Sequence, residues 1–323
     1  MVRLAPPLSR TKVPVRRGRS ALAATRRRGC TEGDNGRGNA MRPYYAAELP
    51  VLVGVDGSRS ATGAVGVAAA EALRRRCRLT VLHAVHDTSP AGEDEGRAVL
   101  RDAAVAARAA GLTDAELETL LVAGDPARVL CQHADKAAMV VVAHRGTSML
   151  EDLIIGSTAA KVSADSPAPV LLVRGTEHAV GPIVVGVDGD PASRPVIETA
   201  FYEAEIRGTD CTAVHTWTGP VSSGPGDMLP LVYDVAEVKG EEQAVLGEAL
   251  AGMREAYPDV TVQEMLIKGP AARTLERLSH TAQLIVIGTR ARRSSANLVP
   301  GKVRRHLLHH SACPVLVVPR EGT

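Results

Sequence analysis

The sequence predicts two tandem α/β domains, each built on a parallel sheet with helices on both faces. The main observation is an internal repeat, because the segment VLVGVDG at 51–57 returns as IVVGVDG at 183–189, an offset of 132 residues. Two later segments, GDPARVL at 124–130 and PAPVLLV at 167–173, return as GPAARTL and ACPVLVV at an offset of 145, so the second copy carries 13 extra residues. A period of roughly 135 residues has the size of a whole globular domain, which indicates a duplicated domain.

The first half of copy one alternates apolar runs with helical periodicity. The run at 51–56 is aliphatic and ends in Asp-Gly-Ser, which predicts a buried strand, and apolar residues at helical spacing predict a helix over 60–77. A second apolar run at 79–85 predicts a strand, and the Ala-rich segment 96–111 predicts a helix. Residues 116–122 alternate in polarity as a strand does.

The second half of copy one repeats this alternation. Proline in its first turn marks a helix over 126–134, and the aliphatic run 139–143 predicts the fourth strand. A helix is expected over 156–164, and 170–173 is expected to be a fifth strand, entered through two prolines. Strands that alternate with helices require a parallel sheet with right-handed crossovers, covered on both faces.

Copy two follows the same plan. Its strands are expected near 183–187, 211–216, 260–266, 284–287 and 315–318. The insertion at 218–230 is rich in Gly, Pro and Ser, which predicts a surface loop. We therefore expect one domain over 49–176 and another over 181–320.

Composition restricts the setting of the protein. Only seven of the 323 residues are aromatic, so both cores are expected to be aliphatic. The five cysteines lie far apart without paired spacing, which argues against a disulfide framework or a zinc site and favours a reducing, cytoplasmic setting. No apolar run approaches the roughly 18 residues that a membrane helix needs, so no membrane contact is expected.

The N-terminal segment 1–48 is predicted to be disordered. Its first 40 residues carry ten Lys or Arg against two acidic residues, with almost no aliphatic periodicity. This charge of +8, taken from the whole-chain +2, leaves −6 for the remainder, so the folded part provides no electrostatic argument for nucleic acid. A start codon assigned too early, with Met41 as the true first residue, is the preferred explanation, and an organelle transit peptide is the alternative.

The residues with the most chemical character follow strands one and four. In an open parallel sheet a ligand lies beyond the carboxyl ends of the strands, where the strand order reverses. Asp56 ends the first strand and could accept hydrogen bonds from a ribose or help to hold a metal. After strand four, Gly146 would allow backbone to approach an anion, and the helix opening at 156–158 would present free N–H groups and hydroxyls to it. With an apolar wall near Val85 and Val142, these features predict a nucleotide pocket.

These segments resemble the universal stress protein family in its tandem form, over residues 51–320. Its ATP-binding members carry Gly-x2-Gly-x9-Gly-Ser/Thr after strand four, and this chain has Ala143-x2-Gly146-x9-Gly156-Ser157, with alanine replacing the first glycine. The resemblance implies flavodoxin-like (Rossmann-like) five-stranded sheets in order 3-2-1-4-5, domains paired through their fifth strands, and bound ATP with magnesium near Asp56. The implied ATP contacts are Asp56, Val85, Ala143, His144, Gly146, Gly156, Ser157 and Thr158.

The corresponding site of copy two is expected to be weak or empty. Asp188 is retained, but the motif is Gly288-x2-Ala291-x9-Gly301-Lys302. Ala291 adds a side chain where backbone approach matters, and Lys302 replaces the hydroxyl residue. Lys302 could still meet a phosphate as a point charge.

Two basic features of copy two are interpreted as solvated surface. His306, His309 and His310 share one helical stretch, but no carboxylate or cysteine is spaced with them as a metal ligand would be. A group of cations near the degraded site could bind an anion or an acidic partner: Arg290, Arg292, Arg293, Lys302, Arg304 and Arg305. No metal site made by the protein alone is predicted.

The common enzyme motifs do not fit. Gly-x-Gly-x-x-Gly is absent after both first strands, Gly301-Lys302 is not part of a Walker loop, and no Gly-x-Ser-x-Gly elbow occurs. We therefore expect an ATP-binding signalling module of the stress response with an unknown protein partner. The alternatives are a scaffold that works without nucleotide and, third, a slow ATPase. A homodimer of the tandem chain is left open.

Overall fold

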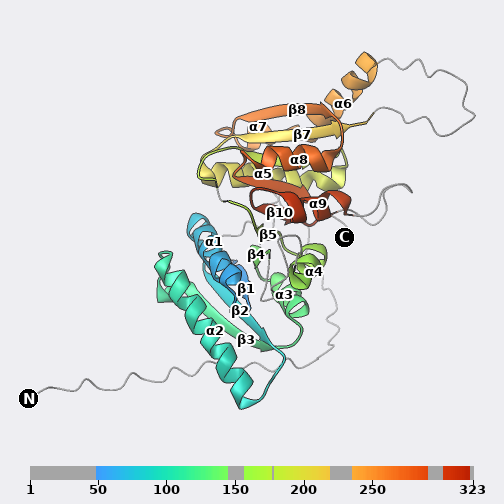
Figure 1. Ribbon diagram of the computed structural model, residues 1–323. Helices are drawn as coiled ribbons and strands as arrows, with labels where there is room; N and C mark the ends of the chain where they lie inside the picture. Colours follow the sequence, from blue (N-terminus) through green and yellow to red (C-terminus); the bar gives the residue numbers. More distant parts are fainter. Residues whose placement is uncertain (1–48, 145–155, 177, 219–234, 290–300, 321–323) are drawn as a thin grey trace, which may run out of the picture.

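The computed structural model describes residues 49–144, 156–176, 178–218, 235–289 and 301–320 (Figure 1). Its strands are β1 (Val51–Val55), β2 (Leu79–Val85), β3 (Leu117–Ala123), β4 (Met139–Ala143), β5 (Val170–Val173), β6 (Ile183–Val187), β7 (Cys211–Trp217), β8 (Val262–Lys268), β9 (Leu284–Gly288) and β10 (Val315–Val318). Its α-helices are α1 (Arg59–Arg75), α2 (Pro90–Ala109), α3 (Pro126–Ala134), α4 (Ser157–Asp165), α5 (Arg194–Arg207), α6 (Val235–Ala249), α7 (Met253–Ala256), α8 (Ala271–Ser279) and α9 (Lys302–His310). Short 3-10 turns lie at η2 (Asp114–Glu116) and η3 (Pro191–Ser193). The segment 1–48, the loop after β4 and nearly all of the insertion at 218–230 fall outside the described residues.

The ten strands form one sheet in the order β3-β2-β1-β4-β5-β10-β9-β6-β7-β8. Within each half the strands are parallel and follow the order 3-2-1-4-5, as expected. The halves meet where β5 and β10 run antiparallel, with Leu171 opposite Leu316. The predicted pairing through the fifth strands is therefore confirmed. It makes the two domains a single continuous sheet.

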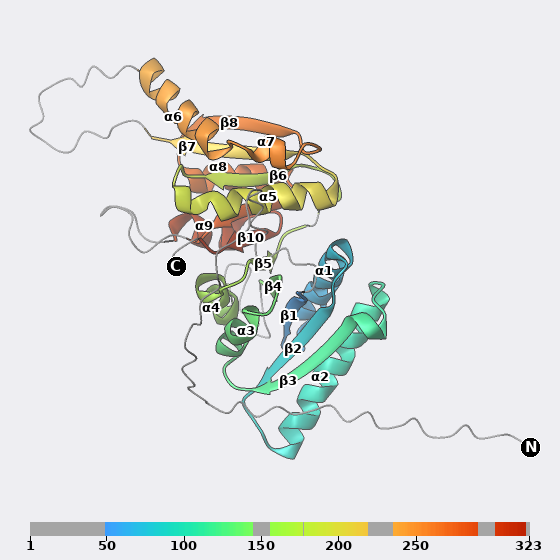
Figure 2. The same cartoon turned by 180° about the vertical axis from the view of Figure 1, so that it is seen from behind.

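Alternation along the central strands divides the core into two layers. Val51 and Val53 of β1 pack with the apolar faces of α1 and α2, whereas Leu52 packs with α3 and α4 on the other side. Figures 1 and 2 show these helix pairs on opposite faces of the first half of the sheet. The core is aliphatic as predicted, and Phe201 of α5 is its one fully buried aromatic ring among the described residues.

Several element boundaries differ from the expected ones by one or more residues, and two of these differences have an identifiable cause. The second helix begins at Pro90 and not at position 96, because the Ser89 side chain caps it by accepting from Gly92 N at 3.2 Å. The polar first turns of this helix carry no apolar periodicity that would have revealed them. Strand β8 begins at Val262, two residues late, because Val260 is buried in a turn in which its N–H donates to Tyr257 O.

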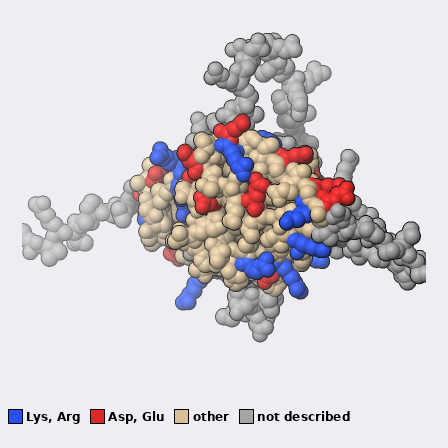
Figure 3. All heavy atoms as spheres, turned by 90° about the horizontal axis from the view of Figure 1, so that it is seen from above, with Lys and Arg blue, Asp and Glu red and all other residues tan. Residues whose placement is uncertain are grey.

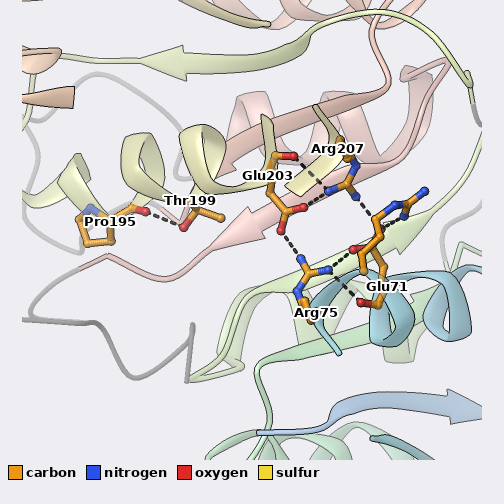
Figure 4. Close-up of polar contacts among 7 residues, drawn as sticks. Glu71, Arg75, Pro195, Thr199, Glu203 and Arg207 are labelled. Atoms are coloured by element: carbon orange, nitrogen blue, oxygen red, sulfur yellow. Dashed lines mark hydrogen bonds and ion pairs between the residues drawn. The ribbon is translucent and has the colours of Figure 1, made fainter. Parts of the chain in front are cut away.

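Four charged side chains meet where α1 and α5 approach each other across the domain junction (Figure 4). Arg75 forms ion pairs with both Glu71 and Glu203, and Arg207 pairs with the same two carboxylates. Each of these side chains is at most 8% exposed. We call this group the interdomain quartet. Burial alone would raise the pKa of Glu71, but nearby guanidinium groups outweigh burial and lower it.

Candidate functional site

A cavity of about 290 Å³ opens at the carboxyl ends of β1 and β4, where the strand order of the first domain reverses. It is the position at which ligands bind in open parallel sheets. The residues lining it come from β1, β2, β4 and the helices α1, α3 and α4: Gly54, Val55, Asp56, Ala61, Leu82, His83, Ala84, Pro126, Leu130, Val142, Ala143, Gly156, Ser157, Thr158 and Ala159. The structure thus brings together six predicted contacts: Asp56, Ala143, Gly156, Ser157, Thr158 and the apolar Val142.

Asp56 is oriented by the turn that follows β1. One carboxylate oxygen, Oδ1, accepts from Ser58 N at 3.0 Å and from Ser58 Oγ at 2.6 Å. The Ser58 hydroxyl in turn caps α1 by accepting from Ala61 N at 3.1 Å. Gly57 adopts a φ of +81°, which glycine tolerates without strain. Within the described residues no donor bonds to Oδ2, so an exposed carboxylate oxygen is held at the mouth of the cavity.

The start of α4 lies at the end of β4, where the anion cradle was expected. Gly156 N donates to His144 O at 3.1 Å, and His144 N donates to Val173 O at 3.0 Å, so the chain returns directly to the end of β4. Gly156 is the N-cap of α4, and no side chain caps this helix. The first N–H groups of the helix and the hydroxyls of Ser157 and Thr158 therefore provide donors for an anion. Gly146 lies outside the described residues.

The apolar side of the cavity differs from the expected one. Leu82, Ala84, Leu130 and Val142 line it on the α3 and α4 face of the sheet. Val85 is not among the lining residues, because its side chain packs in the opposite layer with α1 and α2. Strand alternation explains this result, since Ala84 and Val85 face opposite sides of the sheet.

Several lining residues were not predicted from the sequence, and two of them, His83 and Gly54, shape the end of β1. His83 Nδ1 donates to Val55 O over 2.7 Å and so fixes the carbonyl that precedes Asp56. His215 makes the same contact with Val187 O at 2.8 Å in the second domain, so the 132-residue repeat could have revealed it. Gly54 allows α3 to approach closely, because a Cβ there would lie 2.8 Å from Leu130 Cδ1.

In the second domain the corresponding aspartate is already occupied by a side chain of the protein. Asp188 forms an ion pair with Arg320 and accepts from Ser193 Oγ at 2.7 Å. Burial would raise the pKa of Asp188, but these hydrogen bonds and the charge of Arg320 outweigh it and lower the pKa. A Cβ on Gly288 would lie 2.8 Å from Arg320 Nε, so the guanidinium group lies across the end of β9.

Arg320 therefore occupies the switch point of the second domain, which the sequence analysis did not anticipate. In the repeat its counterpart is Gly175, where the first copy has no side chain to play this part. Gly301 is the N-cap of α9 with a φ of +72°, and Lys302 is exposed. Ala291 lies outside the described residues.

The histidines of α9 have a partner that sequence spacing did not reveal. His306 Nε2 lies 2.7 Å from Glu276 Oε2, a carboxylate contributed by α8. The hydrogen bond from His306 lowers the pKa of Glu276. Among the described residues no group of three or more His, Cys, Asp or Glu side chains could hold a metal ion.

Two properties of the described residues bear on nucleic-acid and membrane binding: the distribution of surface charge and the apolar character of the helices. Seen from above, acidic and basic side chains are both scattered over the described surface (Figure 3). Nucleic-acid-binding domains concentrate cations on one face, and this face does not. None of the helices in the described part of the chain combines the length and apolar character that crossing a membrane requires.

Comparisons with known proteins agree on one family. The profile of the Universal stress protein family matches residues 49–174 and again 180–319. A universal stress protein of Mycobacterium tuberculosis is 32% identical over 288 residues, covering 83% of this chain and 96% of the relative. One from Mycolicibacterium smegmatis is also 32% identical, covering 84% of this chain and 98% of the relative.

A solved structure that spans most of this chain shows the same fold. A universal stress protein from Archaeoglobus fulgidus matches with a TM-score of 0.60 at 19% identity, covering 85% of this chain and 98% of that one. A shorter universal stress protein, solved in complex with cAMP, covers 40% of this chain and 99% of its own length at 33% identity, with a TM-score of 0.35.

Proposed function

This chain is a member of the universal stress protein family, and we propose that its first domain binds ATP and that the protein acts as a nucleotide-liganded signalling module of the stress response. The observation that carries the proposal is the difference between the two switch points. In the first domain a cavity of about 290 Å³ presents an aspartate and an uncapped helix start. In the second domain the equivalent aspartate is paired with Arg320.

The lining residues suit the three parts of a nucleotide. Leu82, Leu130 and Val142 provide the apolar surface on which a base packs. Asp56 Oδ2 can accept from ribose hydroxyls, and the start of α4 provides N–H groups for the phosphates. Magnesium, when bound with ATP, would neutralise phosphate charge, and among the described lining residues Asp56 is the acidic side chain that could reach it.

The site is better suited to binding than to catalysis. Among the described residues that line the cavity, two side chains are titratable: Asp56 already accepts two hydrogen bonds, and His83 donates to a backbone carbonyl. Both are engaged in holding the end of β1, which suits binding better than proton transfer. We therefore propose a binding protein and not an ATPase. Its four described cysteines are free thiols, which supports a reducing, cytoplasmic setting.

A second candidate is a protein-interaction scaffold that needs no nucleotide. The continuous ten-stranded sheet and the buried interdomain quartet favour it, because both hold the two domains in one fixed arrangement without a ligand. In either case the working units are the domains 49–176 and 181–320. The proposal includes an unidentified protein partner and is compatible with a homodimer of the tandem chain.

The test is a calorimetric titration of the full chain with ATP and magnesium, after any copurified nucleotide has been removed. One site per chain is expected. Gly156→Val should abolish binding, since it places a branched side chain at the start of α4. The counterpart variant Gly301→Val, at the start of α9, should lower stability because Gly301 has a φ of +72°, but it should retain binding with unchanged stoichiometry.

Two other outcomes would change the assignment. Two sites per chain would show that Arg320 and Lys302 do not close the second domain. Absence of binding, for a chain that melts cooperatively and carries no copurified nucleotide, would refute the nucleotide proposal and leave the scaffold function.

A further inference from the structure

The interdomain quartet has the symmetry of the duplication. Glu71 and Arg75 of α1 recur as Glu203 and Arg207 of α5 at the 132-residue offset. Each arginine reaches both carboxylates, so the contacts are reciprocal, as in an interface between two identical subunits (Figure 4). Several neighbouring residues depart from this symmetry, and one of them contacts the quartet: Arg74 of α1, which corresponds to Ile206 of α5.

This departure leaves an excess of positive charge at the junction. Arg74 Nη1 lies 2.7 Å from Glu71 Oε1, an oxygen that also accepts from Arg207 Nη2 at 2.5 Å. The other Glu71 oxygen is paired with Arg75, so three guanidinium groups share one carboxylate. With Glu203 counted, three guanidinium cations face two carboxylates, a net charge of +1. The Arg74 side chain that carries this excess is 40% exposed, so a counter-ion can reach it from solvent.

A cavity adjoins this excess charge. Its volume is about 330 Å³, and it is lined by Val67, Glu71, Arg74, Leu171, His178, Ala179, Arg207, Gln283, Leu284 and Pro314. The guanidinium-bearing residues Arg74 and Arg207 contribute to its wall, and the carboxylate there is already bonded to three arginines. A small anion in this cavity would therefore meet guanidinium charge that the two carboxylates do not balance.

His178 provides a second, independent observation. Its Nε2 atom is buried, yet it has no hydrogen-bond partner among the described residues. Buried polar atoms are nearly always hydrogen-bonded, so an orphaned one on a residue that lines a cavity indicates a missing partner. An imidazole N–H beside two guanidinium groups is a donor set suited to phosphate or sulfate oxygens.

We propose that this interdomain cavity is a binding site for a small tetrahedral oxyanion of the phosphate class. The ligand would be either inorganic phosphate or the phosphate group of a small metabolite. Because α1 and α5 contribute their C-terminal turns, the site lies at the amino edge of the sheet, opposite the ATP cavity. It shares no lining residue with that cavity, so the inference is independent of the proposed nucleotide function. A bound oxyanion would bridge both domains and stabilise their junction.

The experiment measures thermal unfolding of the full chain in a buffer free of phosphate, with phosphate added at constant ionic strength. The Gly156→Val variant is used as the background, so that the cradle of the first domain does not contribute. We expect Tm to rise by several degrees at phosphate concentrations far above Kd. Arg74→Ile, which copies the residue of the second domain, should abolish the rise, and Arg74→Lys should restore part of it.

Arg108→Ile is the matched control, since Arg108 is another half-exposed arginine that pairs with a carboxylate but does not line the cavity. It should leave the phosphate-dependent rise intact. The rise within each variant is compared, so a change in baseline stability does not confuse the result. A rise that needs glycerol 3-phosphate in place of inorganic phosphate, and still depends on Arg74, would assign the metabolite as the source. No rise with either ligand, or an equal rise in Arg74→Ile, would overturn the proposal.

Discussion

Removing one carboxylate from the interdomain quartet should strongly destabilise the protein. Glu203 is 1% exposed and pairs with both Arg75 and Arg207. Glu203→Gln keeps the side-chain volume, so it creates no cavity, but it raises the excess positive charge at the junction. Breaking a buried ion pair on one side typically costs about 3–5 kcal/mol, because the remaining charge is left buried without compensation. A fall in Tm on the order of 10 °C should follow.

The matched control lies on the same helix. Glu198→Gln breaks an ion pair with Arg194, whose side chain is 52% exposed, and it should cost less than about 1 kcal/mol. Both variants are measured by urea denaturation followed by circular dichroism, with the wild-type chain alongside. Adding Arg207→Met to Glu203→Gln should recover part of the loss, because it removes one of the three cations that would otherwise share the single carboxylate of Glu71. Equal costs for Glu203→Gln and Glu198→Gln would refute the reasoning, since they would show that the quartet is solvated.

Three further predictions concern the two switch points. Arg320→Met should lower stability at pH 7 and have less effect at pH 3. The pKa of Asp188 is depressed in the folded state, so the stability that this carboxylate contributes is present above its unfolded pKa and is lost as pH falls through its folded pKa. Urea midpoints measured at both pH values test this. Equal losses at pH 3 and pH 7 would contradict it. Gly54→Ala should weaken ATP binding at least tenfold in calorimetry, because its Cβ would lie 2.8 Å from Leu130 of α3. The control is Gly186→Ala in the second domain, whose nearest contact would be at 3.2 Å and which should leave ATP binding unchanged. His83→Ala should weaken ATP binding several-fold by freeing the carbonyl at the end of β1, with Tm reduced by only a few degrees; unchanged affinity would show that this carbonyl needs no anchor.

Local patterns predicted most of the fold. The aliphatic runs placed β2, β4, β5, β6 and β10 at their observed bounds, because a strand buried on both faces must be continuously apolar. The start of α2 was missed because its first turns are polar and are held by a cap and not by packing. The shift of β8 has a similar origin, since a buried valine in a turn resembles the first residue of a strand.

Local patterns in the sequence also predicted part of the candidate site. Asp56 and the start of α4 were identifiable because they belong to segments that end at strand termini, where a parallel sheet gathers them. Val85 was assigned to the wrong face, since a one-residue step along a strand reverses the side-chain direction.

The sequence by itself determined the duplication, the order of strands and helices, the aliphatic cores and the residues that end β1 and open α4. These are properties of segments a few residues long, in which periodicity and turn chemistry act locally. Only the tertiary structure decided which distant charges meet: Arg320 with Asp188, Glu276 with His306, and Glu71 with Arg207. An ion pair depends on the positions of two side chains brought together by packing, and no spacing along the chain encodes that distance.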